Sequence, residues 1–123
     1  MRKIAALLFL IAVSNPTTAA VVCPVAEKDL LGYWSKSSQA GNFEEFLLEV
    51  DAGTRTFNSW LHQRPDLMQA TWKIEHCRLV ITSRSGEHPE IRLKIVGLGE
   101  GKLRLYDELA REGSIYRRSG DAP

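Results

Sequence analysis

The feature that most constrains the fold of this chain is a period-two alternation of apolar and polar residues in short segments after residue 30. It is clearest over residues 90–96, where Ile91, Leu93 and Ile95 alternate with charged or polar residues. Successive side chains of a strand point to opposite faces, so this pattern predicts antiparallel strands with one buried face. No later segment repeats apolar residues at helical spacing, and the alternation therefore predicts an all-β domain.

Eight segments show this pattern, and turn-forming residues separate them. They are residues 31–35, 43–50, 54–61, 70–75, 78–83, 90–96, 102–106 and 114–118. Pro24 and the helix formers that follow it predict one or two turns of helix over residues 24–30, and Gly97, Gly99 and Gly101 predict a turn. Short connections favour an up-and-down meander. An open sheet would leave two unpaired edges, so we expect about eight strands to close into a small barrel.

The first twenty residues have the three parts of an export signal. Arg2 and Lys3 precede an apolar run over residues 4–13, and small residues follow up to Ala20. A helix that spans a bilayer needs about twenty apolar residues, which this run does not supply. We therefore expect cleavage after Ala20 or Ala19 and no stable membrane anchor afterwards. The mature protein, periplasmic or secreted, then has a barrel domain over residues 21–118 and a flexible tail over residues 119–123.

The only two cysteines are Cys23 and Cys77. Export would carry the chain into an oxidising compartment, where a pair of cysteines in a small domain forms a disulfide. Such a bond would close a loop of more than fifty residues. In the chain-entropy model it contributes up to about 4 kcal/mol to stability.

The segment Leu31-Gly32-Tyr33-Trp34, preceded by a helical turn and followed by an antiparallel meander, resembles the start of the lipocalin-like (calycin) group of small β-barrels. The run from Trp72 to Leu79, residues 90–96 and Tyr116-Arg117-Arg118 are also similar to short bacterial lipocalin-like proteins. The resemblance implies that Trp34 plugs the closed end of the barrel, with Arg117 or Arg118 as its basic partner.

No motif indicates catalysis. His62, His76 and His88 lie in or beside expected turns, without the spacing of a metal site. The chain has no Gly-x-Ser-x-Gly, and the glycines at 97–101 are not followed by the Lys-Ser/Thr of a phosphate loop. We therefore expect a protein that is not an enzyme and needs no metal or cofactor. With 16 basic and 15 acidic residues, the balance of charge also argues against a nucleic-acid partner.

Large apolar residues at inward positions either fill the barrel or line an apolar pocket. Those we consider as ligand-binding residues are Trp34, Phe46, Phe57, Trp72, Ile91 and Leu93.

Outward positions suggest a different site. Arg78, Lys102 and three further cations fall on consecutive strands, which predicts a basic stripe. Trp60 on the polar face of its strand and Leu67 and Met68 in a long loop are candidates for an exposed apolar patch. The partner-surface candidates are Trp60, Leu67, Met68, Arg92, Lys94 and Arg104.

Two functions therefore remain open at this point. One is a carrier or sensor that holds a small hydrophobic molecule in the barrel or at its mouth. The other is a protein-binding module, such as an inhibitor or immunity-type protein, that uses its loops and outer face. An open cavity would favour the first, and a filled barrel with an exposed patch would favour the second.

Overall fold

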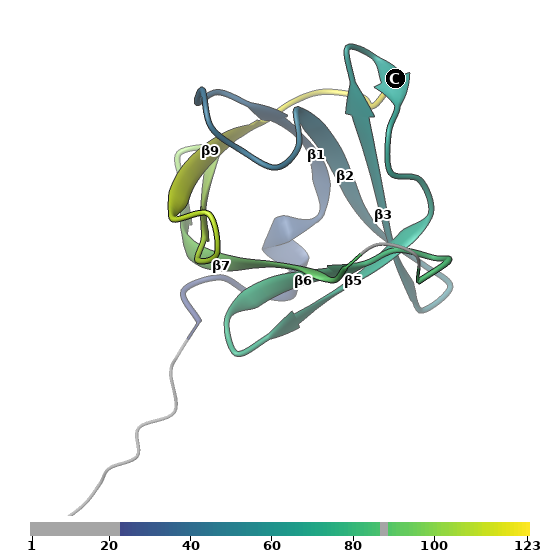
Figure 1. The fold of residues 1–123 in the computed structure, drawn as a ribbon, viewed down its shortest axis with the longest axis horizontal. Helices are drawn as coiled ribbons and strands as arrows, with labels where there is room; N and C mark the ends of the chain where they lie inside the picture. The colour runs from purple at the N-terminus through teal and green to yellow at the C-terminus, as the bar shows by residue number, and fades with distance from the viewer. Residues whose placement is uncertain (1–22, 87–88) are drawn as a thin grey trace, which may run out of the picture.

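Nine antiparallel strands make up most of the computed structural model, which describes residues 23–86 and 89–123 (Figure 1). The strands are β1 (Gly32–Lys36), β2 (Glu45–Asp51), β3 (Thr54–Leu61), β4 (Arg64–Pro65), β5 (Ala70–Glu75), β6 (Arg78–Thr82), β7 (Ile91–Gly99), β8 (Lys102–Asp107) and β9 (Glu112–Arg118). The predicted signal peptide, residues 1–20, lies outside the described residues.

Pairing of the first strand with the last closes the sheet. Strand β1 pairs with β2 on one side and β9 on the other, so Trp34 lies between Phe46 and Arg118. Strands β2, β3, β5, β6, β7 and β8 complete a ring in which every neighbouring pair is antiparallel. Figure 1 shows this ring of strands around a central space. The prediction of an all-β, closed, eight-stranded antiparallel barrel is confirmed.

The strand order is not the simple meander that we expected. Strand β3 pairs with two strands along one edge: Trp60 lies opposite Pro65 of β4, and Phe57 lies opposite Ala70 of β5. A short ninth strand, β4, therefore lies between β3 and β5 along the sequence, and it pairs with the end of β3 beyond the part that pairs with β5. The sequence did not predict β4, because the segment after residue 61 contains a proline and has no alternation.

Two further local predictions are wrong. The helix expected over residues 24–30 is a single 3-10 turn, Glu27–Leu30, flanked by extended backbone at Ala26 and Leu31. Because the backbone is extended at both Ala26 and Leu31, helical conformation is confined to the four residues between them. Strand β7 does not end before Gly97 but continues to Gly99 through a bulge between Ile95 and Gly97. A bulge accommodates one extra residue, so glycines there do not require a turn.

Tight turns join many of these strands. Four of them place two consecutive residues at positive φ, as the type I′ hairpin turn requires. They are Ala52–Gly53, His62–Gln63, His76–Cys77 and Glu100–Gly101. The His76–Cys77 turn has no glycine, and Cys77 is instead bonded to the N-terminal segment.

One end of the barrel is closed by Trp34 and Arg118. The Trp34 side chain is fully buried, and its Nε1 donates a hydrogen bond of 3.0 Å to the Leu30 carbonyl in the 3-10 turn. The Arg118 guanidinium lies 4.3 Å from the centre of the Trp34 ring, a cation-π distance. It also donates hydrogen bonds to the carbonyls of Leu31 and Asp29, at 2.7 and 2.8 Å. Of the two arginines named as partners of Trp34, the structure selects Arg118.

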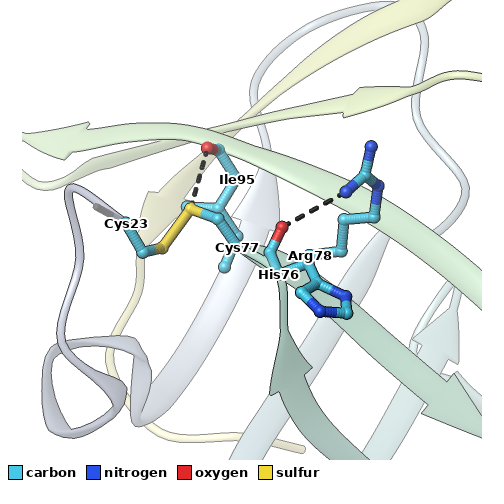
Figure 2. The surroundings of a disulfide bond; sticks show 5 residues. All are labelled: Cys23, His76, Cys77, Arg78 and Ile95. Atoms are coloured by element: carbon cyan, nitrogen blue, oxygen red, sulfur yellow. Dashed lines mark hydrogen bonds between the residues drawn. A yellow bond between two sulfur atoms is a disulfide. The ribbon is translucent and has the colours of Figure 1, made fainter. Parts of the chain in front are cut away.

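The disulfide Cys23–Cys77 joins the N-terminal segment to the β5–β6 turn at this same end (Figure 2). The two Cα atoms are 5.0 Å apart, a separation that a disulfide requires. The Cys77 Sγ lies 3.7 Å from the Ile95 carbonyl, and the Ile95 amide donates to the Cys77 carbonyl at 2.9 Å. The predicted pairing is confirmed, and it holds the 3-10 turn segment beneath Trp34.

We predict that the double substitution Cys23→Ser and Cys77→Ser lowers the free energy of unfolding by about 2 to 4 kcal/mol, because it releases a closed loop in the unfolded chain. Urea denaturation followed by tryptophan fluorescence measures this loss. A reductant should destabilise the wild type by a similar amount and leave the double variant unchanged. Equal stability of the two proteins without reductant would contradict the prediction.

Candidate functional site

The interior of the barrel is filled by side chains. Of the six residues considered for ligand binding, five are at most 3% exposed and belong to the packed core: Trp34, Phe46, Phe57, Trp72 and Leu93. The structure therefore does not bring these five to a cavity. Ile91 differs, because it is partly buried at the end of β7 that lies away from the disulfide and lines a pocket there.

An aromatic cluster fills the interior just below that pocket. The ring centres of Phe43 and Phe57 are 4.8 Å apart, as are those of Phe46 and Tyr116. The Tyr116 hydroxyl donates to the Phe43 carbonyl at 2.8 Å and accepts from the Phe43 amide at 3.2 Å. Burial raises the pKa of Tyr116, so its hydroxyl keeps the proton that it donates. These two hydrogen bonds hold Phe43 across the open end of the barrel.

The pocket lies above Phe43 and has a volume of about 470 Å³. All four connections at the open end contribute lining residues: Asn42 and Phe43, Asp66 and Leu67, Pro89 and Glu90, and Leu109. Its apolar lining consists of Phe43, Leu67, Pro89, Ile91 and Leu109. Phe43 is 6% exposed and forms the floor, whereas Leu109 is 98% exposed at the rim. The site is thus an apolar hollow open to solvent on one side.

Asp107 organises one side of this rim. Its carboxylate accepts hydrogen bonds from the backbone N–H groups of Leu109 and Ala110, at 3.0 and 3.1 Å, and from the Asn42 amide at 3.1 Å. The Ala110 N–H, and after it the Asn42 amide and the Leu109 N–H, lower the pKa of Asp107. An ionised Asp107 therefore connects the β1–β2 connection to the turn that carries Leu109.

Arg92 and Glu90 lie on the opposite side of the pocket. The Arg92 guanidinium forms ion pairs with Glu90 at 2.9 Å and Glu75 at 3.2 Å. Lys73 and then Arg92 lower the pKa of Glu75, so the Glu75 carboxylate remains charged near neutral pH. Val80, on the outer face of the barrel, lies opposite Arg92 in the register and is fully buried. The aliphatic part of an arginine side chain can cover apolar surface in this way.

The predicted apolar partner patch does not form. Trp60 is 7% exposed, and its ring packs edge-on against Tyr33 with 5.9 Å between centres. The expectation of an exposed Trp60 is therefore wrong, because Tyr33, two strands away on β1, covers it. Burial, followed by the neighbouring Glu45 carboxylate, raises the pKa of Tyr33 to about 12. Leu67 is half-buried in the pocket wall, and Met68 is exposed beside it.

The predicted basic stripe divides into paired and unpaired cations. Arg78 forms a two-pronged ion pair with Glu108, at 2.7 and 3.1 Å, and Arg92 is paired as described above. Lys94 lies opposite Arg78, and its charge helps to lower the pKa of Glu108. Arg104 and Lys102 on β8 form no such pair within the described residues.

The sequence pattern does not identify Asn42, Phe43, Asp107 and Leu109 as parts of one site. Asn42 and Leu109 lie in connections and Asp107 is the last residue of β8, where alternation gives no information. Phe43 was assigned to the strand segment 43–50, but β2 begins only at Glu45. Two signals were present: in a meander every second connection lies at the same end of the sheet, and Leu109 is an isolated large apolar residue in a polar turn.

No family model, no curated protein and no solved structure matches this chain. Among the described residues, no group of three or more His, Cys, Asp or Glu side chains is placed to hold a metal ion. The same part of the chain contains no helix with the length and apolar character needed to cross a membrane. Any statement of function therefore rests on the pocket and the surface of this molecule.

We predict that Tyr116→Phe lowers the free energy of unfolding by about 1 to 3 kcal/mol, because it leaves the buried Phe43 carbonyl without its donor. Chemical denaturation measures the change. Tyr106→Phe is the matched control, since Tyr106 is half-buried and its hydroxyl forms no hydrogen bond within the described residues. A loss equal to that of the control would show that the pair of hydrogen bonds to Phe43 contributes nothing.

We predict that the stabilising effect of Asp107 depends on pH. Its pKa in the folded protein lies below the ordinary value of 3.8, so its contribution is present above pH 3.8 and is lost as the pH falls through the lower, folded value. The difference in unfolding free energy between wild type and Asp107→Ala, measured from neutral pH into acid, should be constant and then decline. A difference that grows in acid would contradict this assignment.

Proposed function

We propose that this protein binds a small apolar molecule at the mouth of the barrel and acts without catalysis. The observation that carries this proposal is the pocket of about 470 Å³ above Phe43, to which the connections at the open end contribute. Ligand pockets commonly measure about 300 to 1,000 Å³ and combine apolar walls with a few fixed polar groups. Here Phe43, Leu67 and Ile91 supply the walls, and Asp107 is a polar group fixed by three hydrogen bonds.

A lipocalin-like classification is consistent with this function. The support is the closed eight-stranded barrel with a buried Trp34 at one end and Arg118 stacked on it, as the resemblance of the Gly32-Tyr33-Trp34 segment implies. The filled interior changes where a ligand would lie. Phe43 and the rings beneath it occupy the centre of the barrel, so we place the ligand above Phe43 and in contact with Leu109.

We also propose that the protein is exported and acts in the periplasm or outside the cell. Residues 1–20 have the composition of a signal peptide, and the disulfide Cys23–Cys77 is of the kind that persists in oxidising compartments.

Binding of a protein partner is the second candidate function. The observation in its favour is that Leu61, Met68 and Leu109 are all exposed near the open end of the barrel. A protein target would cover these side chains together, whereas a small ligand would contact only those that line the pocket, such as Leu109.

A fluorescent apolar probe, N-phenyl-1-naphthylamine, tests the pocket. We expect the wild type to bind it with enhanced fluorescence, and Leu109→Gln to weaken binding about fivefold, because part of an apolar side chain no longer covers the probe. Leu61→Gln is the matched control: Leu61 is also exposed near the open end but does not line the pocket. The fluorescence titration gives the dissociation constants.

Two results would contradict the proposal. Absence of probe binding to the folded wild type would remove the pocket as an apolar site and favour a protein partner. An equal effect of Leu109→Gln and Leu61→Gln would show that the probe binds to exposed apolar surface in general.

A further inference from the structure

The outer face of strands β8 and β9 carries three cations. On β8, Lys102 and Arg104 alternate with Leu103 and Leu105, which are at most 1% exposed inside the barrel. On β9, Arg117 follows the fully buried Tyr116. Because alternate residues of a strand face opposite sides, the three cationic side chains point outward. We call Lys102, Arg104 and Arg117 the basic wall.

The basic wall has no counter-charge of its own. Lys102 lies directly opposite Arg117 in the β8–β9 register, and like charges at opposed positions destabilise a sheet. Within the described residues, no acidic side chain forms an ion pair with any of the three. Along the register, Glu45 lies beyond Ser35 on the far side of β1. Along the chain, Glu100 lies in the adjoining turn, and Asp107, three residues after Arg104, is held by the hydrogen bonds at the pocket rim.

This situation contrasts with the neighbouring strands. Arg78 on β6 is paired with Glu108, and Arg92 on β7 is paired with Glu75 and Glu90. On the outer surface of the barrel, the arginines of β6 and β7 are thus paired with acids, whereas the cations of β8 and β9 in the basic wall are unpaired within the described residues. The local cost of opposed like charges is offset if the wall meets an external anion.

Small and interfacial side chains lie among the cations. Gly97 is opposite Arg104, and Gly99 is opposite Lys102; open space lies where a Cβ would stand at either glycine. Val96, in the bulge of β7, is 52% exposed. Tyr106 is half-buried at the upper end of β8. At these two glycines, therefore, no β7 side chain keeps a broad surface away from Arg104 and Lys102.

We propose that the basic wall docks this protein onto a bilayer that contains anionic phospholipids. The three cations lie on one exposed face of two neighbouring strands about 4.8 Å apart, so a surface that carries many headgroup phosphates can contact all three at once. Each cation near an anionic membrane contributes about 1 kcal/mol. Val96 and Tyr106 add an exposed aliphatic group and an amphipathic ring, which are favourable at the interface between headgroups and acyl chains.

An acidic protein is a poorer match to this wall. The centre of a protein interface is depleted of charged residues and rich in aromatic and aliphatic side chains. Here the centre is occupied by cations and glycines, and Tyr106 lies at the edge. This proposal is independent of the pocket, because none of the three wall residues lines it.

Vesicle co-sedimentation tests the proposal with two lipid mixtures, phosphatidylcholine alone and equal parts of phosphatidylcholine and phosphatidylglycerol. We expect the wild type to bind only the anionic vesicles and to be released by high salt. The triple variant Lys102→Gln, Arg104→Gln, Arg117→Gln should bind at least about tenfold more weakly, given the contribution of each cation. Its stability should not fall, because the substitution removes a repulsive pair.

The matched control is Lys28→Gln, Arg64→Gln, Arg84→Gln. It removes the same number of charges from exposed cations on other parts of the surface and should bind within about twofold of the wild type. The proposal is overturned if the folded wild type does not bind anionic vesicles or binds both mixtures equally. It is also overturned if the two triple variants lose binding to the same extent, since net charge alone would then explain the effect.

Discussion

The pairing of β1 with β9 is the interaction on which the rest of this structure depends. It joins Trp34 to Arg118 across the seam and turns a row of strands into a closed ring, so that every ring strand has a partner strand on both sides. Closure also forces one residue in two to face a narrow interior. Eight strands enclose a space that side chains can fill, and here Trp34, Phe46, Phe57 and Tyr116 are fully buried in it.

Closure gives the barrel two unlike ends. The two-residue turns Ala52–Gly53, His76–Cys77 and Glu100–Gly101, the 3-10 turn and the disulfide lie at the end sealed by Trp34 and Arg118. The longer connections lie at the opposite end, where Phe43 is held across the opening by Tyr116. A rigid floor beneath longer connections is an arrangement that suits ligand binding, because the scaffold positions the loops while their side chains remain accessible. The proposed function follows from this division between the ends.

The outer face shows a second division. Arg78 on β6 and Arg92 on β7 form ion pairs with Glu108, Glu75 and Glu90. The basic wall of Lys102, Arg104 and Arg117 has no such partners among the residues that the structure describes. The net charge of the whole chain is only +1, but the basic wall makes one part of its surface locally positive. A ligand pocket at one end and a membrane-docking wall along the side would be compatible functions of one small barrel.

The sequence by itself determined the strands, the closure into an eight-stranded barrel and the disulfide. Strands β3 and β5 have the predicted bounds, because alternation reflects the period of the backbone, and two cysteines allow one pairing. Only the tertiary structure decided the burial of Trp60, the short strand β4 and the pocket above Phe43. Trp60 is covered by Tyr33 from two strands away, and the pocket needs four connections to converge at one end. These features depend on contacts between residues far apart in the chain, which a local pattern does not encode.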